Sequence, residues 1–247
     1  MTRQSGFTLA ELAIVMLVFS ILLGGMFVSI TTQMDLRNIS DTRKSMDQAR
    51  EALIGFAVAH GYLPCPASAT SNSANTPTGN GTETTRVAGN CTVFDGYLPA
   101  VTLSITPTDA QGFLVDSYGT RVRYAITSDT QFTTTNTANQ IKQVGIAAMN
   151  PNVAVCSTST GISATDCSGT STRLTNTAVA VLYSLGKNGR LPTGGTGADE
   201  AKNLDGNRSF VYHDLTDSSS ANGEFDDLLT WLSPNILYNR LIAAGAI

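Results

Sequence analysis

The segment FTLAELAIVMLVFSILLGGMFVSI, residues 7–30, contains a single charged residue, Glu11. As a helix these residues would span about 36 Å, enough to cross a hydrocarbon core of about 30 Å. A carboxylate inside a bilayer is costly unless it is paired. Glu11 lies near the start of the apolar run, five residues after Gly6, which ends a short polar leader, MTRQSG. This placement indicates an acid that is retained for a function.

Two ordinary explanations of the run compete with that interpretation. A secretory signal has an apolar core of roughly 7–15 residues followed by a cleavage site, so residues 7–30 are too long for one. A plain single-pass membrane anchor remains the alternative. Charge does not decide the orientation, because Arg3 precedes the run while Arg37, Arg43 and Lys44 follow it.

The helical pattern continues beyond the apolar run. Residues 31–60 contain no proline and become amphipathic, so we expect one helix from Phe7 to His60, about 80 Å long. One stripe of this helix is expected to pack on a partner. Its members are Leu36, Ile39, Met46, Ala49, Leu53, Phe56 and His60.

Gly24 and Gly25 are the weak point of this helix, because each glycine costs roughly 1 kcal/mol relative to alanine in a helix interior. Two explanations stay open. The pair permits close packing of neighbouring helices, or it gives the helix a place to bend or melt.

Composition limits the environment of the rest of the chain. Charged residues make up 14% of the sequence and the net charge is −4, which argues against a surface for nucleic acid or anionic lipid. Four cysteines without CxxC spacing favour two disulfides in an oxidising compartment. Three pairings are compatible with the spacing. We favour the sequential one, Cys65–Cys91 and Cys156–Cys167, in which each pair brackets a polar loop.

Short segments rich in β-branched or aromatic residues follow the first loop and predict strands. A helix followed by several strands favours an α+β fold, with an antiparallel sheet packed on the helix. Ser233-Pro234 has the pattern of a helix start, and a closing helix is expected to reach about Ala244. The predicted strands are 121–126, 144–149, 152–156, 178–184 and 209–213.

The sequence offers little for catalysis. His60 and His213 belong to no recognisable motif, and His60 is expected to be a buried or half-buried structural residue. The glycines of GKNGRLPTGGTG do not match a phosphate-binding loop and indicate a long turn. Eight carboxylates lie between residues 199 and 227, where hard oxygen ligands would suit calcium. The spacing of an EF-hand is absent, and a solvated acidic region is the alternative.

The stretch GFTLAEL, residues 6–12, resembles the processing and assembly motif of type IV pilins and type II secretion pseudopilins. The resemblance implies that a prepilin peptidase cuts between Gly6 and Phe7 and methylates the new amino terminus at Phe7. It also implies that Glu11 pairs with the terminal amine of a neighbouring subunit during assembly. A carboxylate and an ammonium within the bilayer offset each other's free-energy cost of burial only when the two subunits pack in the correct register.

Three fragments of the remaining chain are similar to the head of the major pseudopilin of type II secretion. They are DSYG at 116–119 followed by Tyr124, SLGKNG at 184–189, and FDDLLTW at 225–231. The resemblance implies a structural calcium ion held by Asp226 or Asp227 and by backbone near Leu185. Two positions depart from the family pattern, because Tyr118 replaces a tryptophan and Asn188 replaces an aspartate.

The sequence therefore predicts a non-enzymatic filament subunit. Its expected parts are a leader at 1–6, a transmembrane and filament-core helix at 7–30, and a periplasmic or extracellular head at 31–247. It is expected in the inner membrane before assembly and in a pilus or pseudopilus afterwards, with prepilin peptidase, other pilin subunits and an inner-membrane assembly platform as partners. No cofactor is required apart from the implied calcium. The length and insertions favour a minor or specialised subunit; a major pilin, an adhesin-like subunit and, remotely, a membrane-tethered periplasmic enzyme are the alternatives.

Overall fold

The helix α1, Leu9–His60, is the first element of the computed structural model, which describes residues 8–68, 80–168, 171–191 and 194–247, and only the backbone of 23–31. The helix is continuous through Gly24 and Gly25. It ends at Gly61, whose φ of +82° favours glycine and whose N–H donates to Ala57 O at 2.8 Å. The chain divides into two compact units, Met1–Ser40 and Asp41–Ile247.

The first unit contains the apolar run. Its described side chains between Leu9 and Leu22 are exposed in the isolated chain. Within the described residues, we found no helix whose length and apolarity would suffice for a membrane span. The expectation of a transmembrane front half at residues 7–30 is therefore not confirmed.

The second unit begins with the last five turns of α1, and its buried stripe differs from the predicted one. Met46, Ala49 and Leu53 are buried as expected. The prediction was wrong for Leu36 and His60, which are exposed, while Phe56 is half-buried. The stripe is completed instead by Thr42 and Ala57. Its spacing of four, three, four and four residues places these side chains on one face of the helix.

A four-stranded antiparallel sheet forms the centre of the second unit, in the order β1-β2-β5-β7. One face of the sheet lies toward α1, where Arg50 Nη1 donates to Thr230 Oγ1 of β7 at 3.3 Å. Because side chains alternate along a strand, Leu229 and Trp231 of β7 point to the other face. The strands are β1 Asp95–Tyr97, β2 Arg123–Ile126, β5 Ala180–Ser184 and β7 Leu228–Leu232.

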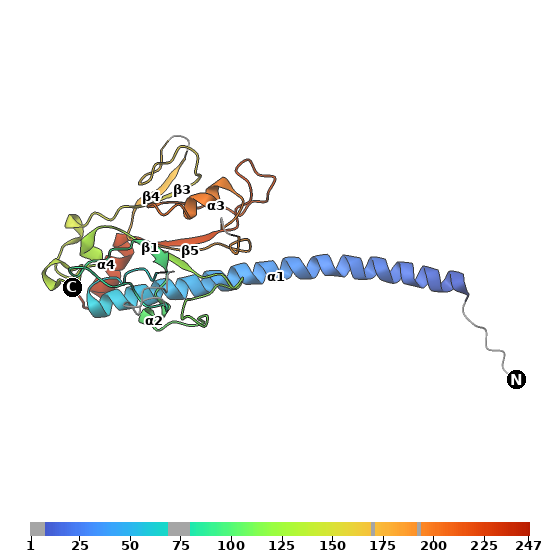
Figure 1. Ribbon diagram of the computed structural model, residues 1–247, viewed down its shortest axis with the longest axis horizontal. Coiled ribbons are helices and arrows are strands. Elements are labelled where there is room, and N and C mark those ends of the chain that lie inside the picture. Colours follow the sequence, from blue (N-terminus) through green and yellow to red (C-terminus); the bar gives the residue numbers. More distant parts are fainter. Residues whose placement is uncertain (1–7, 69–79, 169–170, 192–193) are drawn as a thin grey trace. The chain divides into compact units, whose positions relative to one another are not determined.

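A second sheet covers that other face. Its order is β4-β3-β6, with β4 antiparallel and β6 parallel to β3, so the expectation of a purely antiparallel sheet holds only for the first sheet. Figure 1 shows β3, β4 and α3 together on the side of β5 away from α1. Val155 and Phe210 pack with Tyr183 and Leu229 in one apolar cluster between the sheets. The strands are β3 Val153–Cys156, β4 Arg173–Ala178 and β6 Ser209–Val211.

The remaining elements are short. The predicted closing helix is confirmed as α4, Pro234–Ala243, with Ser233 as its N-cap. The strand predicted at 144–149 was wrong, because this stretch has mostly exposed side chains and forms a 3-10 turn. The other elements are α2 Ala100–Leu103, α3 Ala198–Asn203, and the 3-10 turns η1 Thr130–Phe132, η2 Thr137–Asn139 and η3 Ile146–Ala148.

Both predicted disulfides, Cys65–Cys91 and Cys156–Cys167, are confirmed. The base of the first loop is also held by polar contacts. Glu83 Oε2 accepts the Cys65 N–H at 2.9 Å and pairs with Arg86 Nη2 at 2.7 Å. Arg86 Nη2 also donates to Leu63 O at 3.1 Å. The loop between the cysteines is thus anchored by the disulfide and by hydrogen bonds to the segment that follows α1.

Removing the first disulfide should destabilise the protein more than removing the second. The bonds close segments with sequence separations of 26 and 11 residues, for which loop-closure entropy gives about 3.5 and about 2.8 kcal/mol. We expect urea unfolding to show a larger loss in the free energy of unfolding for Cys65→Ser/Cys91→Ser than for Cys156→Ser/Cys167→Ser, which is the matched control. Equal midpoints for the wild type and the first double variant would contradict this expectation.

Candidate functional site

Glu11, the predicted assembly residue, lies in the first turn of α1 and is paired within its own chain. Glu11 Oε2 accepts hydrogen bonds from the Thr8 N–H and from Thr8 Oγ1, both at 2.9 Å. The Glu11 N–H donates back to Thr8 Oγ1 at 3.3 Å. This reciprocal arrangement is a capping box, and the T-x-x-E pattern before an apolar run is its sequence signal. Gly6 and Phe7, the predicted processing residues, lie outside the described residues.

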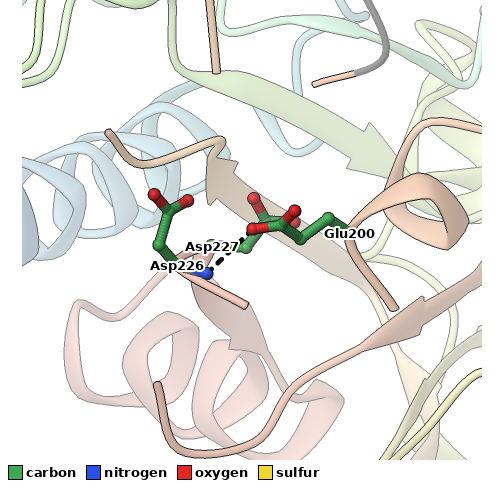
Figure 2. A group of neighbouring side chains, drawn as sticks. All are labelled: Glu200, Asp226 and Asp227. Carbon is green, nitrogen blue, oxygen red and sulfur yellow. Dashed lines mark hydrogen bonds between the residues drawn. The ribbon is translucent and has the colours of Figure 1, made fainter. Parts of the chain in front are cut away.

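A second group of functional side chains lies in the head, where Glu200 of α3 meets Asp226 and Asp227, which immediately precede β7. One carboxylate oxygen from each lies within 4.8 Å of the others. Figure 2 shows the carboxyl groups of Glu200 and Asp227 next to each other, and its dashed line marks the bond from the Asp226 N–H to Glu200 Oε1, at 3.0 Å. Glu200 and Asp227 are buried and Asp226 is half-buried. We call these three residues the acidic cluster.

The Glu200 carboxylate is fully supplied with donors. Oε2 accepts the N–H groups of Thr196 and Gly197 at 3.0 and 3.1 Å, which lie at the start of α3. Oε1 accepts Asn188 Nδ2 and the Asp226 N–H, both at 3.0 Å. Four donors thus occupy both oxygens of this buried carboxylate.

Asp226 is enclosed by the segment LGKNG, residues 185–189, which we call the 185–189 loop. Asp226 Oδ2 accepts the Asn188 N–H at 3.1 Å. Gly186 has a φ of +59°, and a Cβ atom there would lie 2.3 Å from both Asp226 O and Asp226 Oδ1. Only glycine allows this approach of the loop to Asp226. The pKa of Asp226 is raised to about 7, chiefly by burial and also by the charges of Glu200 and Glu224, against the backbone donors of Asn188 and Lys187.

Asp227 is the most deeply enclosed member of the cluster. Its Oδ2 accepts Asn203 Nδ2 at 2.7 Å, and Asn203 is itself fixed by the Val211 N–H, which donates to Asn203 Oδ1 at 2.7 Å. Burial raises the pKa of Asp227 well above its usual range, and Glu200 and Asp226 raise it further while the Asn203 hydrogen bond lowers it. The acidic cluster thus gathers carboxyl groups whose charged forms are disfavoured by burial and by one another.

Three buried oxygens at this place accept no hydrogen bond from the residues that the structure describes. They are Asp226 Oδ1, Asp227 Oδ1 and Asn188 Oδ1. Buried polar atoms in folded proteins almost always have a partner, so these acceptors point to a missing donor or cation. Carboxylate and amide oxygens are the hard ligands that calcium takes. The residues present therefore fit a calcium ion.

The structure brings together most of what the sequence predicted for this site. Asp226 and Asp227 lie beside the loop that follows Leu185, as the head resemblance implied. Sequence reasoning did not single out Glu200 or Asn188 as site residues. A signal for Glu200 was available, since a glutamate three residues after a helix N-cap, here Gly197, is a capping position. No local pattern indicated that its Oε1 would reach Asp226.

The contacts of the two histidines indicate structural roles. His60 is exposed at the end of α1 and stacks on Phe56 with ring centroids 4.0 Å apart, so the prediction that it would be buried or half-buried was wrong. His213 Nε2 lies 3.1 Å from Asp199 Oδ2, and its ring stacks on Phe225. Asp199 also accepts the Ser159 N–H at 2.6 Å. His213 and Asp199 therefore join α3 to the second disulfide loop.

Comparison with known proteins identifies the N-terminus. Residues 1–27 match the family described as the prokaryotic N-terminal methylation motif, which includes Gly6, Phe7, Glu11 and the paired glycines. No curated protein and no solved structure matches the chain. The chain therefore carries at residues 1–27 the signal of type IV pilins and pseudopilins.

Proposed function

We propose that this protein is a structural subunit of a type IV pilus or a type II secretion pseudopilus. The observation that carries the proposal is the methylation motif at residues 1–27. In this proposal the chain is a prepilin anchored in the inner membrane by residues 7–30, with its head outside the cytoplasm. Prepilin peptidase cuts between Gly6 and Phe7 and methylates Phe7. The mature subunit then joins other pilin subunits through its N-terminal helix, at an inner-membrane assembly platform.

The features of the head favour a minor or specialised subunit over a major one. The chain has 247 residues, with long polar insertions between the three fragments that are similar to the major pseudopilin. Two disulfides support export, because such bonds persist in oxidising compartments. In this proposal the protein is a substrate of enzymes rather than an enzyme, and His213 serves to hold α3 in place.

We also propose that the head binds a structural calcium ion. Asp226, Asp227 and Asn188 would hold it through the three oxygens that accept no hydrogen bond, with Glu200 next to them. The ion would supply positive charge to a buried cluster of carboxylates and would tie the 185–189 loop to the start of β7. Glu200 keeps its own donors and thereby fixes Asn188 and the Asp226 backbone in place.

Intact-mass measurement of the protein from its native membrane tests the proposed processing. We expect the mature chain to lack residues 1–6 and to carry one additional methyl group at Phe7. Gly6→Val is the matched control, because a β-branched residue at the cleavage position should block the peptidase and leave the leader attached. A wild-type product that keeps Met1, or one that begins after residue 25, would overturn the pilin assignment.

A further inference from the structure

The DSYG fragment at 116–119 forms a turn around a buried carboxylate that the proposed function has not yet used. Asp116 Oδ1 accepts the N–H groups of Tyr118 and Thr120 at 2.9 and 2.8 Å. Next to it, the Ser117 N–H donates to Thr42 Oγ1 of α1 at 3.2 Å. The turn is therefore fixed on the buried stripe of the helix. Asp116 Oδ2 accepts the Thr120 hydroxyl and can accept one more donor from elsewhere.

That second oxygen reaches the strand that leads to the acidic cluster. Ser184, the last residue of β5, is fully buried and donates its Oγ–H to Asp116 Oδ2 at 2.5 Å. A serine hydroxyl has one hydrogen and two acceptor positions. Because Asp116 takes the hydrogen, the acceptor side of Ser184 Oγ is free for the Gly186 N–H, which donates to it at 3.2 Å.

Gly186 is the point at which this network meets the acidic cluster. Its backbone lies so close to Asp226 that a Cβ would collide with Asp226 O and Asp226 Oδ1. Two residues further on, the Asn188 N–H binds Asp226 Oδ2, while Asn188 Oδ1 is one of the oxygens without a partner. The position of the 185–189 loop thus sets where Asn188 Oδ1 lies relative to the carboxylates.

We propose that Asp116 is a positioning residue for the cation site and acts through Ser184 Oγ on the 185–189 loop. Asp116 touches no ligand itself. Its carboxylate orients the Ser184 hydroxyl, the hydroxyl holds the Gly186 N–H, and the loop then presents Asn188 to the cation. The inference rests on the proposed calcium site. Residues behind a metal's direct ligands commonly change its affinity by about 10- to 100-fold when they are mutated.

Ser184→Ala tests this role in the full-length protein purified in detergent. The change removes one buried oxygen and leaves the backbone bonds of Asp116 intact. Ser209→Ala is the matched control, since Ser209 is also a buried strand serine and its Oγ has no partner. We expect titration calorimetry with Ca²⁺ to show an affinity about tenfold weaker for Ser184→Ala and unchanged for Ser209→Ala. Without calcium, hydrogen exchange in the peptide that contains residues 185–189 should be faster in Ser184→Ala.

Asp116→Asn is the second variant, in case Ser184→Ala fails to fold. It keeps the size of the side chain but replaces one accepting oxygen with a donor, so it should also weaken calcium binding. If the folded variants bind Ca²⁺ with wild-type affinity and show wild-type hydrogen exchange in residues 185–189, the positioning role is wrong. That result would not contradict the calcium proposal. A wild-type protein that binds no Ca²⁺ in the same titration would overturn the calcium site and this inference with it.

Discussion

A Glu11→Ala subunit is expected to accumulate as an intact protein and to stay out of filaments. In the proposed assembly, the Glu11 carboxylate meets the amino terminus of a neighbouring subunit in an apolar environment. Removing one partner of a buried ion pair leaves the other charge uncompensated, at a cost of about 3–5 kcal/mol. A loss of that size lowers the equilibrium for adding a subunit by a factor of at least about 100. The measurement is the amount of subunit in sheared filaments relative to the total amount in the cell.

Thr8→Ala separates this charge pairing from the capping box seen in the structure. The Thr8 hydroxyl donates to Glu11 and accepts its N–H, so its loss weakens the helix start by about 0.5–2 kcal/mol but leaves the carboxylate available. We expect Thr8→Ala subunits to enter filaments. If Thr8→Ala and Glu11→Ala reduce the amount of subunit in filaments to the same degree, assembly depends on the helix cap and not on the Glu11 charge, and the pairing role is wrong.

Calcium should raise the melting temperature of the wild-type protein, and Asp227→Asn should abolish the increase. A ligand at a concentration of 100 times its dissociation constant stabilises the folded state by about 2.7 kcal/mol. For a chain of this length that corresponds to an increase of about 5–10 °C. In chelator, Asp227→Asn should melt no lower than the wild type, because asparagine keeps an oxygen that can accept Asn203 Nδ2 and replaces a buried carboxyl group whose Oδ1 has no partner among the described residues. Differential scanning calorimetry of the full-length protein in both conditions measures these values.

Asp217→Asn is the control for the calcium measurement. Asp217 is an exposed carboxylate outside the acidic cluster, and its nearest donor is the neighbouring Ser219. The calcium response of this variant should equal that of the wild type. A wild-type melting temperature that is the same in calcium and in chelator would contradict the proposal that the head binds calcium. An equal loss of response in both variants would show that the response does not depend on the acidic cluster and would contradict the proposed site.

The strands show where sequence reasoning succeeds and where it does not. β2, β3, β5 and β6 were located because they are buried and rich in β-branched or aromatic residues. β4, RLTNTA, was missed because most of its side chains are exposed, and its pairing with β3 alone makes it a strand. β1 has three residues with a central glycine, and β7 is rich in leucine. Neither has the composition that predicts a strand.

The sequence by itself determined the features that depend on neighbouring residues. These are the methylation motif, the long N-terminal helix and the helix start at Ser233. Each rests on local spacing, which a single segment of chain displays in full. For the disulfides, the bracketed polar loops favoured one of three compatible pairings, which the structure then confirmed. Only the tertiary structure brought Glu200 and Asn188 to Asp226 and Asp227, and Asp116 to Ser184. These contacts join positions 12 to 68 residues apart, and they exist because two sheets and α3 pack together. No local pattern encodes that packing.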